Sequence, residues 1–269
     1  MKKLIKGLIM ATVGLLALPQ AFTVTAYGQT ANQKRLVSYS SCDAGSPSTD
    51  VIKYDANGRV SEILAVGVRT VYDWSGYSRG QVKGVFKSSK TTLRQTYTLD
   101  AKGRVVKAEV SNDKGLLSTT EFGYDAAGRL VSVKDSGDKE KLREMYKSPS
   151  VAKFIYENGA LRHINVSYTV AGQDDNVLYK STEKIANKGG WTIMVMQLLP
   201  EMTTFSIMED LAILNLLGTP VAELPMSVTY VTDDDGGYSQ DLKIKWTLDS
   251  DGYPQQLSVD GNAATFIWE

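Results

Sequence analysis

The sequence predicts a mainly β protein: a large curled antiparallel meander sheet or barrel-like closed form, soluble, with a short apolar helical insert packed on the sheet's apolar face. Three observations predict it. One turn motif recurs, short segments alternate apolar and polar residues, and one stretch, Trp191–Leu217, is apolar without alternation. We expect roughly 14–16 strands, since strand boundaries are predicted only to within a few residues.

The recurring motif is "YDANGRV" at 54–60, "LDAKGRV" at 99–105 and "YDAAGRL" at 124–130, with a looser "LDSDGYP" at 248–254. An aspartate at the first position of a type I turn accepts hydrogen bonds from backbone amides two residues on. A glycine at the end of that turn takes positive φ without a Cβ clash, which gives a hairpin with a G1 bulge. The flanking Tyr or Leu and Val or Leu are expected to pair across the ladder.

Alternation supports half-buried antiparallel strands around these turns. In Leu242–Leu248 the apolar residues share one face and the polar ones the other, and Arg162–Val170 repeats the pattern. The motif copies are unevenly spaced, which argues against a solenoid or propeller with one repeat length. An up-and-down meander with hairpins of different length fits better.

The apolar insert has the signals of a buried helix. Ser206 and Glu209 form an S-x-x-E capping box, and Gly218 and Pro220 follow as stop signals. Because the residues between them are apolar on nearly all sides, we expect the helix to be buried. A second short helix is expected over Ile193–Leu199.

The first 28 residues are predicted to be a signal peptide. Lys2, Lys3 and Lys6 precede an apolar run from Leu8 to Leu18, which is too short to span a bilayer. We expect cleavage near Gly28, which leaves residues 29–269 as a single antiparallel β domain that is secreted, periplasmic or at the cell surface. A retained N-terminal anchor is the alternative.

Composition limits the partners. Lysines plus arginines number 30, as do aspartates plus glutamates, so the net charge is near zero. This balance makes nucleic acid and anionic lipid poor candidate partners. The single cysteine, Cys42, excludes an intramolecular disulfide and is interpreted as a free structural thiol.

Two resemblances accompany these patterns. The YDxxGR units resemble the tyrosine-aspartate repeats of Rhs-type bacterial shell proteins. The passages "LAILNLLGTPVAELP", "SVTYVTDDDGG" and "KIKWTLDSDGYPQQLSV" resemble a family of secreted Bacteroidota domains of unknown function, and this resemblance covers most of residues 35–269. It implies a porin-like antiparallel β fold and supplies no catalytic residues. Many relatives look like lipoproteins, from which the position of Cys42 departs.

One short stretch matches a catalytic motif. Residues 76–80 satisfy G-x-S-x-G, with Ser78 as the nucleophile and His163, the sole histidine, downstream. In a hydrolase that serine lies between a strand and a helix. Here another strand is expected to follow, so the motif is interpreted as a hairpin loop.

Metal sites fit no better. Calcium was considered at Asp233–Asp235 and at Asp249 and Asp251, but neither set matches an EF-hand loop. The sequence therefore predicts no catalytic, cofactor-binding or metal-binding residues and no cofactor.

The leading functional hypothesis is a non-enzymatic, exported structural or binding module whose strand tyrosines contact a glycan or an envelope protein. Ordinary core packing is the competing interpretation of those tyrosines. One alternative is an outer-membrane β-barrel, favoured by the aromatic C-terminus Phe266–Glu269, although membrane insertion is disfavoured because an apolar helix needs an apolar interior. A hydrolase is the second alternative.

Overall fold

The computed structural model describes residues 34–43, 46–137, 150–168, 174–180, 184–191, 205–232, 238–259 and 262–269. The predicted signal peptide, the predicted helix over Ile193–Leu199 and the aspartates at 233–235 lie outside these ranges.

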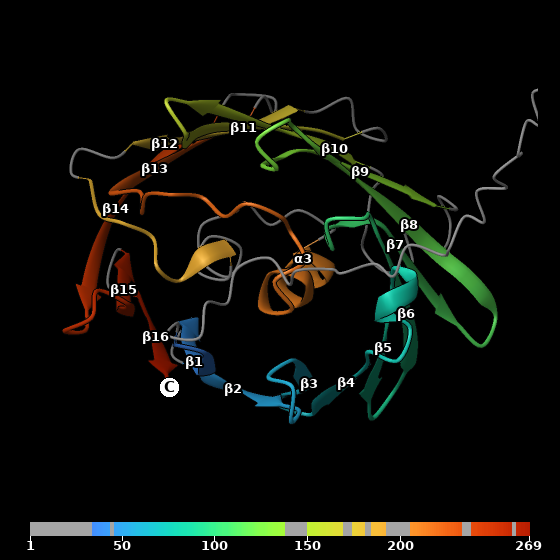
Figure 1. The fold of residues 1–269 in the computed structure, drawn as a ribbon. Helices are drawn as coiled ribbons and strands as arrows, with labels where there is room; N and C mark the ends of the chain where they lie inside the picture. Colours follow the sequence, from blue (N-terminus) through green and yellow to red (C-terminus); the bar gives the residue numbers. More distant parts are fainter. Residues whose placement is uncertain are drawn as a thin grey trace, which may run out of the picture.

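The described strands form a closed antiparallel barrel in which each strand pairs with its neighbours in the chain (Figure 1). Closure comes from β1 and β16, which pair from Leu36 opposite Trp268 to Ser41 opposite Ala264. The predicted up-and-down meander is thus confirmed, and its sixteen strands lie within the expected range. The strands are β1 (Leu36–Asp43), β2 (Ser46–Tyr54), β3 (Val60–Ala65), β4 (Val68–Asp73), β5 (Gln81–Ser88), β6 (Thr92–Leu99), β7 (Val105–Asn112), β8 (Gly115–Tyr124), β9 (Leu130–Gly137), β10 (Ser150–Glu157), β11 (Ala160–Tyr168), β12 (Asp174–Lys180), β13 (Ser227–Thr232), β14 (Tyr238–Leu248), β15 (Pro254–Val259) and β16 (Asn262–Trp268).

The recurring motif forms the hairpins that were predicted. In the first copy, Asp55 Oδ1 accepts the backbone N–H groups of Asn57 and Arg59 at 2.8 and 2.9 Å, and Gly58 has φ of 75°. The flanking residues pair as expected, with Tyr54 opposite Val60 and a bulge beside them. The glycines at 103, 128 and 252 also have positive φ. All four hairpins join an even-numbered strand to the next odd-numbered one, so they meet at one end of the barrel, here called the motif rim.

Three motif arginines, and Arg35 just before β1, link neighbouring parts of the rim. Each arginine lies over an aromatic ring further along the chain, and that aromatic side chain donates a hydrogen bond to the carbonyl of the residue after the arginine. The stacked pairs are Arg35 and Tyr54, Arg59 and Trp74, Arg104 and Tyr124, and Arg129 and Tyr156. The corresponding acceptors are the carbonyls of Leu36, Val60, Val105 and Leu130. The repeat therefore fastens the barrel wall hairpin to hairpin.

Helix α3 (Phe205–Ile213), in the described part of the apolar insert, lies inside the barrel, as Figure 1 shows. Ile207, Met208 and Leu211 are almost fully buried there, which confirms the predicted buried helix. The helix ends before the predicted stop at Gly218, because Asn215 adopts the left-handed conformation at φ 57° and Leu216 N–H bonds back to Leu211 O. Asparagine tolerates this conformation and can end a helix as glycine does.

Gly218 has a different role: it joins the insert to the motif rim. Thr219 pairs with Arg129 in an isolated bridge, and Thr219 N–H donates to Gly128 O at 2.9 Å. A Cβ at Gly218 would lie 2.5 Å from that same carbonyl oxygen, and φ is 75°. Only glycine fits this close approach without displacing backbone.

The two faces of the barrel wall differ in chemistry. The inner face is mainly apolar and forms one core cluster with α3, although it includes buried polar residues such as Gln95, Thr120 and Asp135. The outer face carries charged side chains, which form a row across three strands: Lys107 on β7 lies opposite Glu121 on β8, and Glu121 lies opposite Lys134 on β9. None of the helices within the described ranges has the length and apolar character needed to cross a membrane.

Candidate functional site

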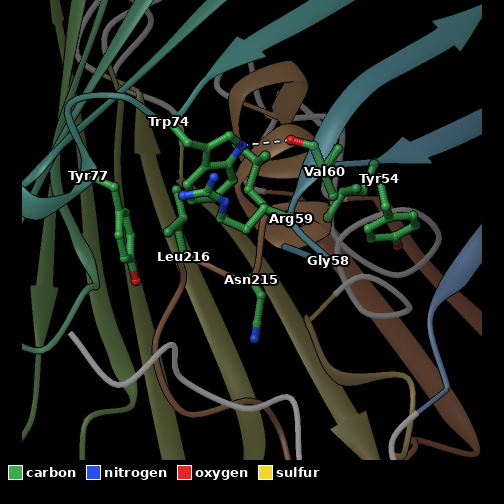
Figure 2. Close-up of a pocket in the computed structure, with 10 residues that line it drawn as sticks. Tyr54, Gly58, Arg59, Val60, Trp74, Tyr77, Asn215 and Leu216 are labelled. Atoms are coloured by element: carbon green, nitrogen blue, oxygen red, sulfur yellow. Dashed lines mark hydrogen bonds between the residues drawn. The ribbon is translucent and has the colours of Figure 1, made fainter. Parts of the chain in front are cut away.

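A small pocket of about 90 Å³ lies beneath the motif rim, between the first hairpin and the end of α3 (Figure 2). Arg59 dominates it, yet its guanidinium pairs with Asp55 at 2.8 Å and lies over the Trp74 ring at 5.6 Å. Trp74 Nε1 donates to Val60 O at 2.7 Å. These groups already have partners, so this pocket is part of the arginine–aromatic contacts that connect the hairpins of the motif rim, here called the rim linkage.

A larger cavity of about 250 Å³ lies between α3 and the inner wall formed by β1 to β7. We call it the acidic cavity. Its polar lining residues are Tyr39, Asp50, Thr70, Gln95, Glu209 and Asp210. Its apolar lining residues are Ile63, Ala65, Val68, Phe86, Leu93, Val110, Ile207 and Ile213. The turns β3–β4 and β5–β6 adjoin it, so it lies toward the end opposite the motif rim.

Asp210 on α3 is the most enclosed acid of this cavity. Its Oδ2 accepts hydrogen bonds from Gln95 Nε2 at 3.1 Å and from Tyr97 OH at 3.5 Å. Burial raises the pKa of Asp210 to about 6 despite these donors, and Asp50 adds repulsion. The carboxyl is thus held by neutral donors that orient it without neutralising it.

Glu209 and Asp50 complete the acidic set. Burial, followed by the charges of Asp210 and Asp50, raises the pKa of Glu209 to about 7. Burial also raises the pKa of Asp50, although Tyr39 OH donates to its Oδ2 at 2.5 Å. No ion pair within the described ranges involves any of these three acids. Buried carboxylates normally have a cationic partner or become protonated, so this arrangement is unusual for a purely structural core.

Gln95 adds an unsatisfied acceptor to the same wall. The residue is 6% exposed, and its Oε1 is buried with no hydrogen-bond partner among the described atoms. Buried polar atoms are nearly always paired in folded proteins. The acidic cavity therefore combines three carboxyl groups with an unpaired amide oxygen, and its described lining residues include no lysine, arginine or histidine.

The structure separates the residues of the considered hydrolase motif. Ser78 is exposed in a 3-10 turn (Tyr77–Arg79) that leads directly into β5, which confirms the hairpin interpretation. His163 lies on β11, and β6 to β10 stand between β5 and β11 in the barrel.

The two acids of the second candidate calcium site both have a lysine partner. Asp249 and Asp251 both pair with Lys34 at 2.7 Å, which fastens the chain before β1 to the fourth hairpin. The described residues contain no group of three or more histidine, cysteine or acidic side chains placed to hold a metal ion.

The tyrosines correct one premise of the sequence analysis. Tyr72, Tyr97 and Tyr179 belong to the buried core, and five further strand tyrosines are half-buried and pack against it: Tyr39, Tyr54, Tyr124, Tyr156 and Tyr230. These eight tyrosines therefore do not form an outer contact surface, because their side chains lie on the apolar inner face of the strands. The sequence reasoning also missed Asp210 and took Glu209 only as a capping residue. The available signal was an adjacent acid pair inside the apolar run "FSIMEDLAILNLL".

Two solved structures share this fold at low sequence identity. A porin-like protein from Bacteroides uniformis ATCC 8492 has a TM-score of 0.61 and 16% identity, and the alignment covers 87% of this chain and 96% of that one. A porin-like protein from Bacteroides vulgatus ATCC 8482 has a TM-score of 0.63 and 11% identity, covering 88% and 99%. No protein-family model matches the chain, and no curated protein sequence matches it. The chain thus has a porin-like β-barrel fold, whereas the resemblance to a Bacteroidota family of unknown function stays a prediction.

Proposed function

We propose that the protein is an exported, non-enzymatic β-barrel that faces water and binds a small ligand in its interior. One observation carries this proposal: the barrel has charges outside and an apolar, helix-filled inside. A barrel of that kind provides an enclosed space rather than an aqueous channel.

The outer face supports the water-facing part of the proposal. Membrane-spanning barrels have an apolar band around the outside and a polar lumen. Here exposed charged residues occur along most of the wall. They include Lys53, Arg69, Lys83, Lys87, Arg94, Glu121, Lys134, Lys153, Lys243 and Lys245. Placing a lysine at the middle of a lipid-facing strand costs about 2–4 kcal/mol, so such a wall disfavours bilayer insertion.

The second candidate is an outer-membrane barrel. It is favoured by the porin-like description of the two similar structures and by the aromatic residues Phe266 and Trp268 late in β16. Its difficulty is the lumen, because α3 fills the interior with leucine, isoleucine and methionine side chains.

Fractionation tests the proposal. The full chain, expressed with its own export signal, is expected in the detergent-free soluble fraction of the envelope, and the purified barrel should leave vesicles impermeable to small sugars. Recovery only with detergent, or sugar permeability that scales with protein, would instead support the outer-membrane barrel.

The non-enzymatic part has its own test. Wild type and Ser78→Ala are compared on a panel of ester substrates, and no serine-dependent turnover is expected. Turnover abolished by the substitution would revive the hydrolase alternative.

A further inference from the structure

The acidic cavity has the composition of a site that is completed by a cation. Asp50, Glu209 and Asp210 line one space from two elements, β2 and α3. The charged neighbours that influence Glu209 are both acids. A buried carboxylate without a countercharge is unfavourable, and a bound cation removes that cost.

The hydrogen-bonding groups point to the same ligand. Gln95 Oε1 accepts no bond in the described part of the chain, and ionised carboxylates only accept. Gln95 Nε2 and the hydroxyls of Tyr39 and Tyr97 donate to Asp210 or Asp50, and the hydroxyls of Thr70, on the cavity wall, and of Tyr72 lie nearby. All of these donors are neutral, whereas an ammonium group brings up to three donors together with the positive charge that the acids lack.

The rest of the lining defines what the cation is attached to. Apolar side chains, with Phe86, Ile63 and Leu93 among them, form most of the wall. A volume of about 250 Å³ is near the lower end of small-molecule pockets, which run from about 300 to 1,000 Å³. A bare metal ion would leave this apolar space unfilled.

We propose that the acidic cavity binds a small organic cation: a primary or secondary ammonium group held by Glu209, Asp210 and Asp50, on a short apolar or aromatic body that contacts Phe86 and its apolar neighbours. This inference rests on the proposed function of a water-facing barrel with an interior ligand.

Calorimetry with a charge series tests it on the intact wild-type protein at pH 8. The probes are 2-phenylethylamine, its neutral analogue 2-phenylethanol and the anionic 3-phenylpropanoate. We expect the amine to bind at least about tenfold more tightly than the alcohol, because a charge-assisted hydrogen bond is worth more than a neutral one, and the anion not to bind. Equal binding of amine and alcohol, or no amine binding at millimolar concentration, would overturn the inference.

Variants locate the site. Glu209→Gln and Asp50→Asn should each weaken amine binding about tenfold or more, whereas Glu121→Gln, on the outer face of β8, should leave it unchanged. Because the two acids lie on different elements, one variant still tests the site if the other fails to fold. Binding that survives both substitutions would contradict the site. If the amine does not bind but the barrel is soluble without detergent and leaves vesicles impermeable, only the ammonium site is contradicted. If the barrel partitions into membranes, the proposed function itself is contradicted.

Discussion

The aspartates of the motif rim and the acids of the interior have opposite electrostatic situations. At the rim, Asp100 accepts backbone amides from two residues and pairs with Arg104, and these bonds lower its pKa even though burial opposes them. In the interior, burial raises the pKa of Glu209 and Asp210. The rim acids are therefore stabilised as anions, and the interior acids are destabilised as anions.

This difference indicates a structural role for the rim aspartates and a functional role for the interior acids. Asp55, Asp100 and Asp125 find their partners within their own hairpins, and Asp249 adds Lys34 to its turn amides. The rim therefore needs no ligand to balance its acids. The interior acids leave an electrostatic cost that the fold itself does not offset, and such costs concentrate at functional sites. The four predictions that follow test the comparison, beginning with the joint between the two regions.

Gly218→Ala should have the largest effect, since it breaks that joint. The new Cβ would lie 2.5 Å from Gly128 O and 2.9 Å from the Tyr124 ring, at φ of 75°. We expect a loss of about 3 kcal/mol in the free energy of unfolding, measured by urea denaturation followed by tryptophan fluorescence. Gly67→Ala is the matched control: it shares positive φ (73°), but its Cβ would meet nothing within 4 Å. Equal losses would mean that backbone conformation, not the contact, matters at Gly218.

Arg104→Ala tests the rim linkage. Its side chain is 12% exposed, pairs with Asp100 and lies 4.4 Å from the centre of the Tyr124 ring. We expect a loss of about 2 kcal/mol, measured in the same way, because the ion pair, the ring contact and the packing of the aliphatic stem disappear together. Arg94→Ala removes an exposed pair with Asp113 and should cost below about 0.5 kcal/mol. Comparable losses from both substitutions would contradict a specific rim linkage.

Glu209→Gln should stabilise the protein at high pH. A pKa raised from 4.5 to about 7 means that the folded state binds the proton more tightly than the unfolded state. The free energy of unfolding therefore falls as pH rises from about 4.5 to 7. The neighbouring Asp210, Asp50 and Tyr39 lie on α3, β2 and β1, and none supplies a positive charge.

The neutral variant lacks this loss. It should exceed wild type by about 1–3 kcal/mol at pH 8 and nearly equal it at pH 4, in urea titrations without added amine. Glu121→Gln, on the outer face, should show no such difference between the two pH values. A Glu209→Gln protein less stable than wild type at pH 8 would show that the carboxylate has a stabilising partner.

Local chemistry made the rim predictable. The D-x-x-G spacing determines both the turn and the pairing of Tyr54 with Val60, because every interaction lies within seven residues. The buried helix was also predictable from its apolar composition, although its end was not, since Asn215 competes with Gly218 as a terminator. The partner of a motif arginine was not predictable, because strand order in the barrel brings Tyr124 to Arg104.

The acidic cavity could not be predicted from the sequence for the same reason: it is formed by contacts between distant segments. Asp50 and Glu209 are far apart in sequence, and only the position of α3 inside the wall brings both to one cavity. The alternation of residues could place the tyrosines on the apolar face of each strand. It could not show that this face points into a closed barrel interior. Closure depends on the pairing of the first and last strands, a contact that no single segment encodes.

Tyr156→Phe should have the smallest effect, and it divides the rim linkage into its parts. The Tyr156 hydroxyl donates to Leu130 O at 3.0 Å, while its ring lies 4.8 Å from the guanidinium carbon of Arg129. Phenylalanine keeps the ring and loses the hydrogen bond, so we expect a loss of about 1 kcal/mol in the free energy of unfolding. Tyr156→Leu also removes the ring face, and the difference between the two variants measures the cation–π contact, about 0.5–1 kcal/mol at a partly exposed site. If leucine and phenylalanine cost the same, the stacked arginines contribute nothing to closure, and the aspartate hairpins with their aromatic hydrogen bonds suffice to hold the rim.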